Sequence, residues 1–182
     1  MNPDDLPDEE TMARVAAGRS DLLEQLVRRH SVRLLTFICR LVGDRHHGEE
    51  LFQDVFVAVW TKRGQYQYPR PFRPWLYAIA LNKCRESLRR RHSANVSFCE
   101  TEPSSPDATP PEEAMADERA ALLLRAVNRL PPQQRAVVML RVWDEMSYAE
   151  IAEVAGCTEG TVRSHMHLAL ATLRKELEGV VV

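Results

Sequence analysis

Residues 62–92 combine cationic side chains with aromatic rings. This segment holds nine Lys and Arg and a single acidic residue, whereas the whole 182-residue chain has a formal net charge of −2. Cationic groups bind phosphates, and exposed rings stack on unpaired bases. The combination indicates a nucleic-acid site and favours single-stranded or opening DNA over a closed duplex. The candidate contact residues in it include Trp75, Tyr77, Lys83, Arg85 and Arg89.

The alternative for this segment is structural. Its rings would then pack in a core and its arginines would line a solvated helix face. For Trp75 core packing is the stronger interpretation, and for the Arg89-Arg90-Arg91 run the two interpretations are equally good.

A second set of candidate residues lies near the C-terminus. Ser147 and Glu150 have the spacing of a capping box, which predicts the start of a short helix. Gly156 predicts the end of that helix, and Thr158 is placed to cap the next one. Two helices joined in this way indicate a helix-turn-helix rather than an ordinary helical hairpin. The second helix would present Glu159, Thr161, Arg163, Ser164 and His167 outward, toward base edges and phosphates.

The elements that carry these residues are all predicted to be helices. Apolar residues recur every three to four positions, as at Leu34, Leu35, Ile38 and Leu41, and strand patterns are missing. The proline-rich residues 64–74 predict a loop, followed by a helix from Trp75 to about Arg91. We therefore expect an all-α fold with two small helical domains, 11–92 and 112–178, joined by a flexible, Pro-rich, acidic linker at 93–111.

The chain lacks the signatures of an enzyme. No P-loop, GxSxG or HExxH motif occurs, and the four cysteines form no CxxC pair, so we expect no catalytic residues, no cofactor and no metal site. No uncharged apolar run approaches the roughly 20 residues that a membrane helix needs. The acidic start MNPDDLPDEE also has the wrong sign for a signal peptide. These features predict a cytoplasmic protein without membrane insertion.

Three segments taken together resemble a known family. EELFQDVFVAVW, PFRPWLYAIALNKCRESLRRR and LPPQQRAVVMLRVWDEMSYAEIAEVAGCTEGTVRSHMHLALATLRKEL resemble the sigma-70 family of bacterial transcription initiation factors. The compact two-domain layout resembles the extracytoplasmic-function (ECF) subgroup. The resemblance implies that 11–92 is sigma-70 domain two and that 112–178 is domain four. It also implies binding to core RNA polymerase, promoter recognition and help with promoter melting.

The resemblance assigns roles to individual residues. Glu50, Gln53 and Asp54 occupy the positions that contact core polymerase, and their spacing places them on one helix face. A solvated face of an amphipathic helix is the alternative. Within the basic segment, which matches the region for the minus-ten element, Asn82 would help to read a base flipped from the non-template strand. Lys83, Arg85 and Arg89 would hold phosphates, and the loop at 64–74 would line the base pocket.

The C-terminal domain departs from the family pattern. It would bind the minus-thirty-five element, but its second helix has His165, His167, Leu168 and Leu170 where relatives are more basic. We therefore expect weak intrinsic affinity, supplemented by the tethered domain two and by polymerase. The resemblance also implies an anti-sigma factor as a partner. The rival interpretation is a stand-alone helix-turn-helix regulator whose N-terminal domain is a sensor or a dimerisation domain.

Overall fold

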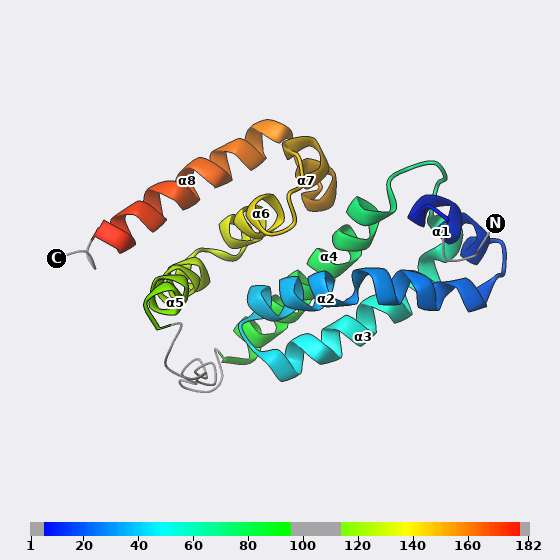
Figure 1. Ribbon diagram of the computed structural model, residues 1–182, viewed down its shortest axis with the longest axis horizontal. Coiled ribbons are helices and arrows are strands. Elements are labelled where there is room, and N and C mark those ends of the chain that lie inside the picture. The colour runs from blue at the N-terminus through cyan, green and yellow to red at the C-terminus, as the bar shows by residue number, and fades with distance from the viewer. Residues whose placement is uncertain (1–5, 96–113, 179–182) are drawn as a thin grey trace. The chain divides into compact units, whose positions relative to one another are not determined.

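The computed structural model describes residues 6–95 and 114–178, and side chains within 6–91 and 121–178. Every regular element in these ranges is helical, as predicted. The chain divides into two compact units, one containing α1 to α4 and the other α5, α6, most of α7, and α8 (Figure 1).

The first unit is a bundle of four α-helices and two short 3₁₀ turns. The elements are α1 (Asp8–Ala16), η2 (Ser20–Leu22), α2 (Leu23–Val42), α3 (Arg45–Lys62), η3 (Arg63–Gln65) and α4 (Phe72–Asn95). Helices α2, α3 and α4 all pack against one another. The apolar stripe predicted on α2 lies in the core, where Phe37 packs against Tyr77 of α4 with ring centroids 5.2 Å apart.

A close approach between α2 and α3 depends on one glycine. Gly48 is in the first turns of α3, and a Cβ atom there would lie 2.9 Å from the Cα of Cys39 on α2. Backbone cannot yield cheaply at that distance, so a larger residue would push the helices apart. The site fixes how the N-terminal end of α3 meets the C-terminal end of α2.

The second unit contains α5 (Ala114–Arg129), α6 (Pro132–Val142), α7 (Tyr148–Ala155) and α8 (Glu159–Glu178). Helix α8 packs against both α5 and α6. Pro132 opens α6, where its missing amide hydrogen removes no intrahelical bond. Ile151, Val162 and Met166 are buried in the core of this unit.

Three predicted boundaries differ from the structure. Helix α4 begins at Phe72 rather than Trp75, because a first-turn residue such as Pro74 needs no intrahelical acceptor. Helix α1 begins at Asp8, before the predicted domain start at 11, with three acidic residues in its first turn. Helix α4 also reaches Asn95, since no proline or glycine stops it at 93. The rest of the predicted linker, 96–111, lies outside the described residues.

Candidate nucleic-acid and protein interfaces

Helix α3 presents a polar face away from the core. Glu50, Gln53 and Asp54 are all exposed on it, as their spacing predicted. Val57 lies one turn beyond Asp54 and is 64% exposed. Sequence reasoning did not select Val57, although its position outside the apolar stripe of α3 was the available signal. A single exposed apolar residue is common on protein surfaces, so Val57 gains its interest from lying beside the acidic residues.

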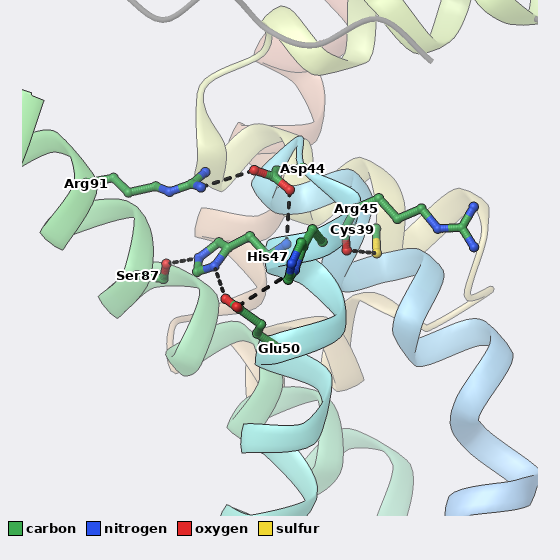
Figure 2. Close-up of polar contacts among 8 residues, drawn as sticks. Cys39, Asp44, Arg45, His47, Glu50, Ser87 and Arg91 are labelled. Atoms are coloured by element: carbon green, nitrogen blue, oxygen red, sulfur yellow. Dashed lines mark hydrogen bonds and ion pairs between the residues drawn. The ribbon is translucent and has the colours of Figure 1, made fainter. Parts of the chain in front are cut away.

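A polar network surrounds Glu50 at the N-terminal end of α3 (Figure 2). Asp44 caps the helix by accepting a hydrogen bond from the His47 backbone N–H at 3.0 Å, and its other carboxylate oxygen lies 3.1 Å from Arg91. The ring of His47 lies between Glu50 and Ser87, at 3.3 and 2.5 Å. His46 lies 3.8 Å from Glu50 and its pKa is raised, first by a backbone hydrogen bond and then by that carboxylate. Both Ser87 and Arg91 belong to α4.

The polar residues predicted to contact DNA on α4 follow its periodicity. Asn82, Arg85 and Arg89 are spaced i, i+3 and i+7, which places them along one face. Asn82 and Arg89 are exposed, whereas Lys83 and Arg85 are half-buried. The helix therefore presents an amide and guanidinium groups in a row, which suits contacts to a base edge and to successive phosphates.

The two rings predicted on this helix do not share that surface. Tyr77 is 1% exposed and packs in the core, so its predicted contact with DNA is wrong. The helical period turns position 77 toward α2. Trp75 is half-buried against Tyr66, at 5.3 Å between ring centroids, as the structural alternative proposed.

Tyr68 is the exposed ring of the loop before α4. Its side chain is 61% exposed, while neighbouring Tyr66 is buried and donates a hydrogen bond to the Arg70 carbonyl. Burial, followed by the charges of Glu9 and Asp8, raises the pKa of Tyr66 to about 12. Tyr66 therefore shapes the loop, and Tyr68 has the free face that base stacking requires. Its place between loop residues, away from any apolar stripe, was the signal in the sequence.

The helix-turn-helix has the predicted caps. Glu150 accepts a hydrogen bond from the Ser147 backbone N–H at 2.8 Å, and the Ser147 hydroxyl accepts from the Glu150 N–H at 3.2 Å. Gly156 has φ +66°, a conformation that side chains disfavour, and so ends α7. Thr158 caps α8 by accepting from the Thr161 N–H at 3.2 Å.

The outward residues of α8 are exposed but partly engaged. Thr161, Arg163, Ser164 and His167 all lie at the surface. Arg163 forms an ion pair with Glu159 at 2.8 Å and lies over the Tyr148 ring, 4.9 Å from its centroid. A phosphate would have to compete with Glu159 for this guanidinium group. Leu168 and Leu170, 52% and 54% exposed, add no charge to the helix.

Two other kinds of site are absent from the described ranges. No cluster of three or more potential metal ligands occurs among those residues. None of the helices there is both long and apolar enough to cross a membrane.

Comparison with known proteins decides the family. The profile for "Sigma-70 region 2" matches residues 26–94, and that for "Sigma-70, region 4" matches 120–173. RNA polymerase sigma factor CarQ of Myxococcus xanthus is 31% identical, over 91% of this chain and 95% of CarQ. ECF RNA polymerase sigma factor SigL of Mycobacterium tuberculosis is 30% identical, over 92% and 97%. This chain belongs to the ECF group of the sigma-70 family.

Solved structures agree with this assignment. CnrH, in complex with the cytosolic domain of CnrY, is 28% identical with a TM-score of 0.72, and the match covers 94% of this chain and 97% of CnrH. RpoE of Bartonella quintana, in complex with the anti-sigma factor NepR, is 23% identical with a TM-score of 0.73 over 85% and 96% of the two chains, which shows the shared fold.

Membership in the family establishes the general activity. An ECF sigma factor is a non-catalytic subunit that directs RNA polymerase in promoter recognition and transcription initiation, and region 4 binds DNA through its helix-turn-helix. The stand-alone regulator is therefore set aside. The region 2 match begins within α2 and ends within α4, so it contains the network around Glu50 and leaves α1 outside.

Helix α1 nevertheless contacts the start of α4 in this sigma factor. Glu9 accepts a hydrogen bond from the Phe72 backbone N–H at 3.1 Å. Asp8 binds His30 of α2 at 2.6 Å, and the His30 ring lies edge-on to Phe72, with centroids 5.4 Å apart. The hydrogen bond from His30 is the main cause of a lowered pKa of Asp8. The acidic first turn of α1 thus supports the loop that carries Tyr68.

Proposed function

We propose that the outward face of α3 binds core RNA polymerase through Glu50, Gln53 and Asp54, with Val57 as an apolar contact. The observation that carries this proposal is the combined exposure of the three polar residues and Val57 on one face. The carboxylates suit a basic partner surface, and Val57 offers area that becomes dehydrated on binding.

The same unit would bind the minus-ten element. Asn82 would read a base flipped from the non-template strand, with Lys83, Arg85 and Arg89 at the phosphates. Tyr68 replaces Tyr77 as the stacking ring, because its side chain is 61% exposed. A captured base has to regain a few kcal/mol lost on unstacking, which stacking and edge contacts together supply.

The second unit would bind the minus-thirty-five element through Thr161, Arg163, Ser164 and His167. Domain two would extend over 11–92, preceded by the α1 residues Asp8–Glu10, and domain four over 112–178, with the Pro-rich acidic linker at 93–111 between them. We place the protein in the bacterial cytoplasm. The family resemblance implies an anti-sigma factor, and we propose one as a further partner of this chain; the similar protein CnrH was solved with a partner, the cytosolic domain of CnrY.

Replacing Glu50, Gln53 and Asp54 together by Ala tests the polymerase site. We expect the affinity for core polymerase to fall by about a hundredfold, which corresponds to about 2.7 kcal/mol, the loss expected if one of the three is a hot-spot residue. Affinity is measured by fluorescence anisotropy with labelled full-length protein, and circular dichroism checks helix content. The control variant, Asp21→Ala with Glu24→Ala, removes the same net charge away from α3 and should bind normally. Unchanged binding by the triple variant would refute the assignment of this face.

A further inference from the structure

The Glu50 carboxylate is held from inside its own helix. The Nδ1 atom of His47, one turn earlier, lies 3.3 Å from Glu50 Oε2 (Figure 2). The side chain of Glu50 is 63% exposed, whereas that of His47 is only 21% exposed. An exposed glutamate ordinarily samples several rotamers, so a half-buried donor beside it restricts where its charge lies.

Glu50 determines which nitrogen of His47 carries the hydrogen, and Ser87 of α4 can supply the matching donor to the other nitrogen. A carboxylate accepts only, so the contact with Glu50 requires the hydrogen on Nδ1. The Nε2 atom of a neutral ring then accepts, and the Ser87 hydroxyl, 2.5 Å away, is its donor. Ser87 is 4% exposed, so its hydroxyl is shielded from bulk solvent. With a neutral ring, the Ser87 hydroxyl thus donates to His47 Nε2, and His47 Nδ1 donates to Glu50.

A second contact joins the same two helices. Arg91 of α4 lies 3.1 Å from Asp44 Oδ2, and Asp44 in turn accepts from the backbone N–H of His47. The backbone and the ring of His47 are thus each connected to α4 by a separate route. The helix that carries the proposed minus-ten contacts supports the position of one polymerase contact.

We propose that His47 is a positioning residue for polymerase binding, which presents the Glu50 carboxylate in a single orientation and whose tautomer is set by Glu50 and supported by the Ser87 hydroxyl. This inference rests on the proposed role of Glu50 in binding core polymerase. It assigns to α4 a role in polymerase binding in addition to its proposed role in DNA binding.

A double-mutant cycle on the full-length chain tests the proposal. Ser87→Ala and His47→Leu are each made with Glu50 present and in a Glu50→Ala background, and the affinity for core polymerase is measured. We expect each change to weaken binding about two- to tenfold when Glu50 is present, the range of a lost hydrogen bond, and to have no effect in the Glu50→Ala background. Ser31→Ala, the same substitution on α2, is the matched control and should bind normally.

The other possible outcomes distinguish failure of the positioning role of His47 from failure of the proposed polymerase site. Equal losses in both backgrounds, or no loss in either, would overturn the positioning role of His47 alone. If Glu50→Ala itself left the affinity unchanged, the proposed polymerase site would fail at Glu50 together with this inference.

The ring of His47 provides a spectroscopic test that a general loss of stability would not move. Two-bond hydrogen–nitrogen correlation spectra of ¹⁵N-histidine-labelled protein at pH 8 should show His47 with its hydrogen on Nδ1. Ser87→Ala should shift that population toward the Nε2 tautomer. A wild-type ring protonated on Nε2, or a tautomer that does not respond to Ser87→Ala, would contradict the proposal.

Discussion

At the scale of single residues, exposure separates the aromatic side chains of the basic segment. Tyr66 and Tyr77 are buried, and only Tyr68, at 61% exposure, presents a large free ring. The cationic residues do not divide in this way, because a long side chain can reach solvent from a half-buried position. Composition therefore located the proposed DNA-binding segment, while the proposed contacts within it depend on which way each helix position faces.

Asn82→Ala should lower open-complex formation more than closed-complex binding. Its proposed partner base is available only after the strands separate, so the lost contact, of about 1–3 kcal/mol, affects the melted state alone. Closed complexes are measured by gel shift at low temperature and open complexes by permanganate reactivity on the cognate promoter. Arg89→Ala, which removes a proposed phosphate contact, should weaken both. Equal losses for Asn82→Ala would contradict base capture.

Cys84 should make the first unit less stable at alkaline pH. Burial raises the pKa of its thiol from its ordinary value of 9.0 to about 12. The buried neutral thiol therefore makes its full contribution to the free energy of unfolding below about pH 9. This contribution is lost as the pH rises toward 12, because the thiol of the unfolded chain ionises first. Urea unfolding of wild type and Cys84→Ala should show the wild-type advantage shrinking between pH 8 and pH 10.5. An advantage that stays constant with pH would contradict the buried thiol.

At the scale of elements, local signals predicted the caps well. The pairs Ser147–Glu150 and Thr158–Thr161 are close in sequence, so their geometry follows from spacing. The start of α4 could not be found in that way, because its first amide is capped by Glu9, 63 residues earlier. The contact between His47 and Ser87, which are 40 residues apart, could not be predicted from the sequence for the same reason. Long-range polar contacts depend on packing, which periodicity does not report.

Glu9→Ala should destabilise the first unit by about 1 kcal/mol, the usual value of a helix cap. Glu9→Gln should lose less, since its amide oxygen can still accept from the Phe72 N–H. The free energy of unfolding is obtained from urea titrations followed by the fluorescence of Trp60 and Trp75 in a Trp143→Phe background. Glu10→Ala, which breaks only an exposed ion pair with Arg14, is the control and should change stability by a few tenths of a kcal/mol. A loss for Glu9→Ala no greater than the control's would contradict the cap.

At the scale of the whole molecule, charge is divided unequally between the two units. The basic segment at 62–92 carries net +8, whereas residues 112–182 carry net −3. In the second unit Arg163 is already paired with Glu159. We therefore attribute most of the promoter affinity to the first unit and to polymerase, with the second unit held near its element by the chain that joins them.

Competition for core RNA polymerase is the most direct test of this account. Purified full-length protein is mixed with core enzyme, alone or with a housekeeping sigma factor, and resolved by size-exclusion chromatography. We predict that the wild-type protein co-migrates with core enzyme and is displaced by excess housekeeping factor. The triple variant at Glu50, Gln53 and Asp54 should not co-migrate with core enzyme. A folded, partner-free protein that does not co-migrate with core enzyme would contradict the account.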